Sequence, residues 1–148
     1  MPLDKSGQLL RESTPIWSDA RSVPQTKQMF ERVNEGEWYY LTGNGFPAPL
    51  YAVFKMMWYR DNEPEMFRQV SKIIGTKDYI NYRLTGRILT DYSYASGSGV
   101  YDLVNWRYSD ELIAASQISR DFFPEIVPSS EVIGQLTPEA SKALGLPR

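Results

Sequence analysis

The sequence predicts a helix-rich α/β fold in a single domain that covers residues 1–148. Apolar residues recur at helical spacing between Leu50 and Trp58, which indicates a helix with one buried face. A second helix is predicted over residues 77–85, and Gly86 ends it because glycine adopts the left-handed conformation without a Cβ clash. A short extended run, Ile88–Thr90, follows directly. Helices that alternate with short strands are typical of the α/β class.

The composition excludes several classes of function. The chain has 148 residues, 42% of them hydrophobic and 23% charged, which is ordinary for a globular domain with one core. The formal charge of −2 gives no reason to expect nucleic acid or an anionic membrane as a partner. The sequence has no long apolar run of the kind that predicts a membrane span, and Met1–Leu10 does not resemble a signal peptide. We therefore expect a cytoplasmic protein. Without cysteine or histidine, neither disulfides nor a zinc site is expected.

The N-terminal third is predicted to contain one hairpin, one helix and one loop. Turn residues between two short segments indicate a hairpin over residues 1–15, with Ile16-Trp17 at the end of its second strand. Ser22 is predicted to cap a helix that has Pro24 in its first turn and ends at Gly36. The Gly- and Pro-rich stretch Glu37–Pro49 is predicted to be largely loop.

The middle of the chain is predicted to hold two amphipathic helices. The first carries Phe54, Met57 and Trp58, which we expect in the core. A break at residues 61–64 precedes a second helix, whose apolar side would be formed by residues at the same spacing: Met66, Val70, Ile73 and Ile74. Two such helices joined by a short turn usually pack antiparallel.

The C-terminal half is predicted to consist of short elements separated by turns. Asp91 and Ser93 are suited to begin a turn, because their side-chain oxygens can accept backbone N–H groups. Pro124 and Pro128 leave little regularity after the brief helical turn that Ser119 begins. The other predicted elements are a strand at Val100–Val104, a helix capped by Ser109, a brief helical turn from Ser119, a strand at Val132-Ile133 and a helix from Thr137-Pro138 to Gly145.

Five stretches of the sequence resemble the N-terminal domain of the FGGY family of carbohydrate kinases, which includes xylulokinase and glycerol kinase. The most extensive is Lys77–Ser96, with Lys-Asp-Tyr, Leu-Thr-Gly and Thr-Asp-x-Ser-x-Ala-Ser in this order. The other stretches follow the family's order as well: residues 16–22, 42–44, 55–67 and 129–141. The resemblance implies a ribonuclease-H-like (actin-like) domain. It also implies ATP-dependent phosphorylation of a ketose or polyol, with ATP and Mg²⁺ bound by the full-length protein.

Trp17, Asp19 and Arg21 are candidates for sugar contacts. An indole can stack on the C–H face of a sugar, and a carboxylate and a guanidinium can bond its hydroxyl groups. The alternative is a core tryptophan beside a surface ion pair. The resemblance favours the sugar site, because the matching block lies beside the substrate in the family. We then expect the three side chains at one rim of the domain beside the Gly43–Tyr51 loop, with Trp17 and Arg21 partly exposed.

Leu50 and Tyr51 complete the predicted substrate-binding set. The resemblance implies that Leu50 stands where glycerol kinases place a tyrosine that touches the substrate, which argues against glycerol as the ligand. Tyr51 is one position away from that tyrosine. No catalytic or metal-binding residue is assigned in this chain.

The resemblance also implies which catalytic parts these 148 residues lack. The chain has no Asp-x-Gly-Thr phosphate loop, and Gly145–Arg148 precedes the position expected for the catalytic aspartate. We therefore expect part of an N-terminal domain that is inactive alone and binds neither ATP nor Mg²⁺. The alternative is a non-catalytic module that binds a sugar or a protein. Self-association is expected through Val100–Val104 or the Leu50/Phe54/Trp58 face, because uncovered apolar faces associate.

Overall fold

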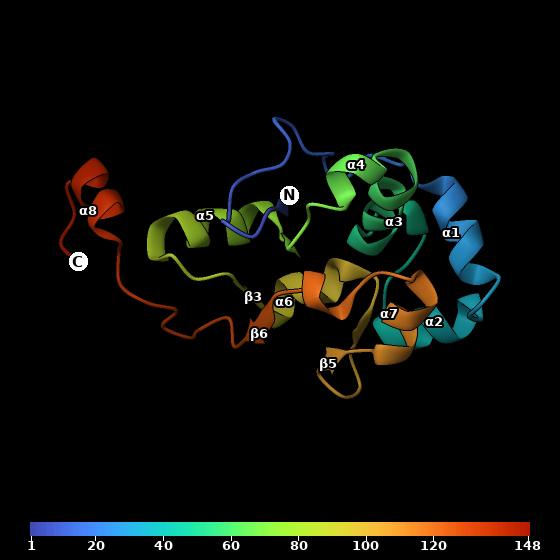
Figure 1. Cartoon of the computed structure of the whole chain (residues 1–148). Helices are drawn as coiled ribbons and strands as arrows, with labels where there is room; N and C mark the ends of the chain where they lie inside the picture. Colours follow the sequence, from blue (N-terminus) through green and yellow to red (C-terminus); the bar gives the residue numbers. More distant parts are fainter.

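The computed structural model describes residues 1–148 and confirms the helix-rich α/β class (Figure 1). The α-helices are α1 (Val23–Phe30), α2 (Glu35–Thr42), α3 (Ala52–Asn62), α4 (Pro64–Phe67), α5 (Thr76–Thr85), α6 (Tyr92–Ala95), α7 (Asp110–Ser116) and α8 (Pro138–Leu144). Three short 3₁₀ helices are η1 (Ala48–Leu50), η2 (Ser96–Ser98) and η3 (Arg120–Phe122). In Figure 1, α1, α2, α3 and α7 gather at one end, and α8 stands apart at the other.

The strands are short and pair as three separate two-stranded sheets. They are β1 (Pro2–Leu3), β2 (Lys72–Ile73), β3 (Leu89–Asp91), β4 (Tyr101–Asp102), β5 (Arg107–Tyr108) and β6 (Glu125–Val127). β1 pairs antiparallel with β2, β3 pairs parallel with β6, and β4 pairs antiparallel with β5. Two of these pairs join segments that are far apart in the chain: β1 with β2 in the first half, and β3 with β6 in the second half.

The predicted N-terminal hairpin is wrong in its strand pairing. A turn at residues 4–7 does bring Leu3 and Leu9 into a single bridge, but the strand partner of Leu3 is Lys72. Residues 16 and 17 do not end a strand, because Trp17 lies in a turn. Leu3 pairs with β2, about 70 residues further along the chain, and its side chain is fully buried in this arrangement.

The predicted helix end at Gly36 and the predicted loop after it are also wrong. α1 ends at Phe30, and α2, at residues 35–42, extends into the stretch expected to be loop. The side chain of Asn34 caps α2 by accepting the backbone N–H groups of Gly36 and Glu37 at 2.8 and 3.1 Å. Such a cap contributes about 1 kcal/mol, which helps to offset the glycine inside the first turn. Gly43, with φ 64°, then ends the helix.

The first of the two predicted central helices is present, and the second is largely absent. α3 buries Phe54 and Met57 as expected, whereas Trp58 is only half-buried. α4 is limited to Pro64–Phe67, and Ile73 belongs to β2. The predicted antiparallel helix pair is therefore wrong, because residues 72 and 73 satisfy their backbone groups by pairing with β1.

In the C-terminal half, the predicted helix ends are confirmed and two predicted strands are not. The side chains of Asp91, Ser109 and Thr137 each cap the helix that follows, by accepting a backbone N–H. The predicted strand at 100–104 is reduced to β4. Residues 132–133 are irregular, and the strand of this region is instead β6, between the two prolines at 124 and 128.

The core lies between α1, α2, α3 and α7, and Trp38 is its largest side chain. Trp38 is 1% exposed, and its Nε1–H donates to the carbonyl of Gly99 at 2.8 Å. Its ring lies edge-on to Phe30, Tyr51 and Phe54, with centroids 5.4–5.9 Å apart. Aromatic residues make up 14% of the chain, and this cluster accounts for part of that share.

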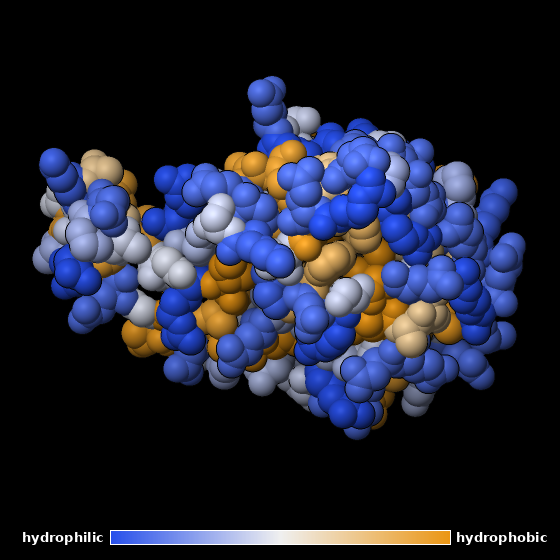
Figure 2. Space-filling model, in the orientation of Figure 1, coloured by the Kyte–Doolittle hydropathy of each residue, from blue (hydrophilic) through white to orange (hydrophobic).

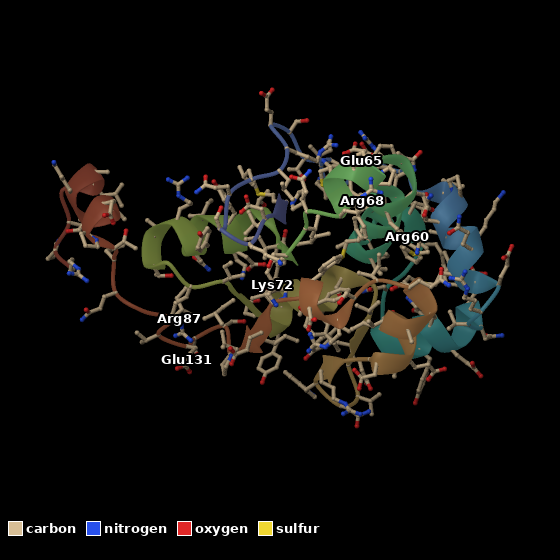
Figure 3. The ribbon with its side chains drawn as sticks, in the orientation of Figure 1. Arg60, Glu65, Arg68, Lys72, Arg87 and Glu131 are labelled. Carbon is tan, nitrogen blue, oxygen red and sulfur yellow. The ribbon has the colours of Figure 1, made fainter.

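Long basic side chains connect the helices at the surface (Figure 3). The guanidinium of Arg60 in α3 donates to the carbonyl of Ser116 at 2.8 Å and to Gln28 Oε1 at 3.1 Å. Lys72 donates to the carbonyl of Phe123, and Arg87 donates to that of Ile133. The bonds of Lys72 and Arg87 hold irregular segments, at Phe123 and Ile133.

The surface is mainly hydrophilic, with hydrophobic residues exposed near the middle of the face shown in Figure 2. None of the helices combines the length and the apolar composition that a membrane crossing requires. Phe54 is completely buried, so the Leu50/Phe54/Trp58 face is not a free association surface. Val104 and Trp106 lie in the turn between β4 and β5 and are 62% and 64% exposed.

Candidate functional site

A cavity of about 720 Å³ opens beside α3 and the start of α5. Four stretches form much of its wall: residues 14–17, 50–52, 73–76 and 93–95. Its size lies within the range of small-molecule pockets, which usually combine apolar walls with a few polar groups. It is therefore the candidate binding site of this chain.

Three of the five predicted site residues line this cavity: Trp17, Leu50 and Tyr51. Trp17 is 76% exposed, so it is not a core residue. Tyr51 is half-buried, because one side of its ring packs against Trp38. Phe46 and Pro47, which the sequence analysis did not single out, lie on the same wall. The Gly/Pro-rich loop thus contributes to the wall that carries Trp17.

Asp19 and Arg21 are not among the residues that line the cavity. They bind one another, with Nη2 of Arg21 at 2.8 Å from Oδ2 of Asp19 and Nε at 2.9 Å from Oδ1. The Arg21 side chain, through these hydrogen bonds, lowers the pKa of Asp19. The guanidinium also lies over the Trp58 ring, 4.8 Å from its centroid. Both side chains therefore fasten the turn that carries Trp17 to α3.

Lys55 lies on the cavity wall, and the sequence analysis did not assign it to the site. It stands within the apolar run Ala52–Trp58, and its Nζ donates to the carbonyls of Ile16, Trp17 and Leu50 at 2.9–3.0 Å. Burial is the main cause that lowers the pKa of Lys55. A lone lysine in the middle of an otherwise apolar helix face was the signal that could have indicated a specific role.

The cavity wall includes buried polar residues, among them Thr90 and Asp78. Oγ1 of Thr90 is buried and has no hydrogen-bond partner in the chain. Asp78 is 1% exposed, and Nζ of Lys77 lies 2.8 Å from its Oδ1. The unpaired hydroxyl of Thr90 can donate to and accept from a ligand hydroxyl group, since a buried polar atom gains from any partner it finds.

The acidic residues do not form a metal site. No group of three or more carboxylates or other typical ligands lies close enough together to hold a metal ion. These residues do not fit a bound Mg²⁺, so we assign no chemical step to a metal here.

The sequence matches one protein family over residues 1–148, described as the FGGY family of carbohydrate kinases, N-terminal domain. It is 36% identical over 149 residues to a protein named xylulose kinase from Klebsiella pneumoniae, and 35% identical over 148 residues to one from Escherichia coli K12. These alignments cover 98% and 97% of this chain but 29% of each relative. The chain thus spans less than a third of the length of these curated relatives.

Solved structures share the fold over almost the whole chain. A xylulose kinase from Rhodospirillum rubrum superposes with a TM-score of 0.90 at 31% identity, covering 99% of this chain and 30% of that one. A gluconate kinase from Lactobacillus acidophilus superposes with a TM-score of 0.87 at 29% identity, covering 99% of this chain and 29% of that one. Together with the family match, these structures confirm the predicted ribonuclease-H-like fold class. With a family match over its full length, the chain belongs to the N-terminal domain family of FGGY carbohydrate kinases.

Proposed function

We propose that this chain forms part of the sugar-binding region of an ATP-dependent kinase that phosphorylates a hydroxyl group of a ketose or polyol. The observation that carries the proposal is the coincidence of the family match over residues 1–148 with a cavity lined by Trp17, Leu50 and Tyr51. Because the relatives named above are xylulose kinases, a ketopentose is the first ligand to test.

The cavity supports sugar recognition through two kinds of contact. The exposed indole of Trp17 offers an apolar face to the C–H groups of a sugar ring or chain. The Thr90 hydroxyl offers a buried hydrogen-bonding group on the same cavity. The contacts of a site with one aromatic face and few polar groups provide little more free energy than association costs in lost freedom of motion. Millimolar affinity, about −4 kcal/mol, is therefore expected for these 148 residues alone.

The first experiment replaces Trp17 by alanine and follows ketopentose binding by NMR. We expect the sugar-induced chemical shifts of the parent chain to disappear, because the C–H stacking surface is lost. The circular dichroism should stay nearly unchanged, since the side chain is exposed.

Ile16→Ala is the matched control, because Ile16 is also exposed on the cavity wall and has no aromatic face. The sugar-induced chemical shifts of Ile16→Ala should resemble those of the parent chain. If Trp17→Ala unfolds the chain, or leaves the sugar-induced shifts intact, Trp17 is not a sugar contact.

The 148-residue chain by itself is expected to transfer no phosphate. It contains no Asp-x-Gly-Thr turn and no metal-ligand cluster. Positioning of the nucleotide and electrostatic stabilisation supply nearly all of phosphoryl-transfer catalysis. ADP release in the presence of ATP, Mg²⁺ and a ketopentose should equal that of a protein-free control. Release that scales with the concentration of the chain would contradict this prediction.

A further inference from the structure

Lys55 uses all three of its ammonium protons on backbone carbonyls. Nζ lies 3.0 Å from the carbonyl oxygen of Ile16 and 2.9 Å from each of those of Trp17 and Leu50. A lysine ammonium has three donors and no acceptor. The group is therefore saturated within the chain, and no proton remains for a ligand, although the side chain lies on the cavity wall.

The surroundings of Lys55 are unusual for a lysine. None of the six ion pairs of the structure includes it. Its hydrogen bonds to three carbonyls, together with the charge of nearby Asp19, offset the partial burial of the ammonium, because such burial is unfavourable unless it is compensated. No direct ion pair engages the ammonium, so its hydrogen bonds to the backbone are the contacts that fix its position.

The three carbonyls come from two segments that are far apart in the chain. Ile16 and Trp17 belong to the turn on one wall, and Leu50 belongs to the loop on the next. Within residues 12–18, no backbone N–H donates to another backbone group outside helices and strands. The ammonium joins the turn to the loop directly, in addition to the 2.9 Å hydrogen bond from Ser22 Oγ to the carbonyl of Pro49.

We propose that Lys55 is a positioning residue that holds the Trp17 turn and the Leu50-Tyr51 loop in one fixed arrangement around the cavity. Its effect on a ligand would act through Trp17, Leu50 and Tyr51, and that part rests on the proposed sugar-binding function. Its effect on the order of the two segments does not depend on any ligand.

The test compares Lys55→Met with the control Lys27→Met by ¹⁵N relaxation of the backbone amides. Lys27 is exposed on α1, and its side chain has no hydrogen bond in the structure. We expect the order parameters of Ile16, Trp17 and Tyr51 to fall from about 0.85 to below about 0.6 in Lys55→Met. Those of α7 should stay unchanged, and Lys27→Met should match the parent chain throughout. Unchanged order at residues 16, 17 and 51 in a folded Lys55→Met protein would overturn the proposal.

A measurement on the parent chain keeps the proposal testable if Lys55→Met does not fold. The ¹⁵Nζ–H signal of Lys55 should be visible, with slower proton exchange with water than that of Lys27, because all three protons are hydrogen-bonded. Exchange at the rate of Lys27 would overturn the proposal. If the parent chain shows no sugar-induced shifts while the order parameters fall as expected, the proposed function fails and the positioning role stands.

Discussion

Replacing Trp38 by alanine is expected to lower the free energy of unfolding by about 4 kcal/mol, because truncation of a buried tryptophan leaves a large cavity. Trp38 is 1% exposed, and four aromatic rings lie with centroids within 6.2 Å of its own. The substitution also leaves the carbonyl of Gly99 without its 2.8 Å partner. Urea denaturation followed by circular dichroism at 25 °C measures the loss.

Two further variants separate the parts of this effect. Trp38→Phe keeps an aromatic ring but removes the indole N–H, so we expect a smaller loss, about 1–3 kcal/mol. Tyr40→Ala is the matched control, because Tyr40 lies in the same helix and is 81% exposed. Its loss should stay within about 0.5 kcal/mol. A loss for Trp38→Ala no greater than that of Tyr40→Ala would show that α2 does not depend on this core contact.

Replacing Lys77 by methionine is expected to cost about 3 kcal/mol, the lower end of the range for breaking a buried ion pair. Nζ of Lys77 lies 2.8 Å from Oδ1 of Asp78 and 2.9 Å from Oδ2 of Asp91. The Asp78 side chain is 1% exposed, so its carboxylate would remain buried without a compensating charge. The lower end applies because the lysine side chain itself is 38% exposed.

The effect of Lys77→Met should depend on pH in a defined direction. Burial opposes ionisation of Asp91, but hydrogen bonds from the Tyr94 N–H and from Lys77 outweigh it and lower the pKa of Asp91. Burial likewise opposes the charge of Lys77, but its bonds to Asp78 and Asp91 outweigh it and raise the pKa of Lys77. A lowered carboxyl pKa stabilises the fold above the unfolded value, about 3.9, and that stability is lost as pH falls through the folded pKa.

A raised lysine pKa stabilises the fold below the unfolded value, about 10.4, and that stability is lost as pH rises through the folded pKa. The difference in unfolding free energy between the parent chain and Lys77→Met should thus be largest between about pH 3.9 and about pH 10.4, and should decrease at lower and at higher pH. Lys142→Met, at an exposed position in α8, should show no such pH-dependent difference. A difference that is constant from pH 3 to pH 11 would contradict the role of the ion pairs.

Helix ends could be predicted from the sequence wherever their chemistry is local. Asp91, Ser109 and Thr137 cap helices through bonds to N–H groups three residues away. Gly86 and Gly145 end helices in the left-handed conformation, with φ 76° and 65°. Asn34 was missed, although the same chemistry applies, because the Gly and Pro residues after it indicated a loop.

The candidate site was predictable only in part. The choice of Trp17, Leu50 and Tyr51 followed from a sequence resemblance, and the structure brings these three residues to one cavity. It turns Asp19 and Arg21 toward each other and places the Arg21 guanidinium over Trp58, so the two charges bind one another and not a ligand. Lys55 was not assigned, because the carbonyls it binds include two that lie 38 and 39 residues before it.

The sequence by itself determined the family, the helix-rich class and those helix boundaries that neighbouring side chains set. Such features depend on residues within one or two turns of each other, so they can be read along the chain. Only the tertiary structure decided the strand pairs, which contain two or three residues and show no alternating pattern. Pairing of Leu3 with Lys72, and of Leu89 with Glu125, requires the folded chain to bring both partners together. The same holds for the cavity, because its walls come from segments that meet only after folding.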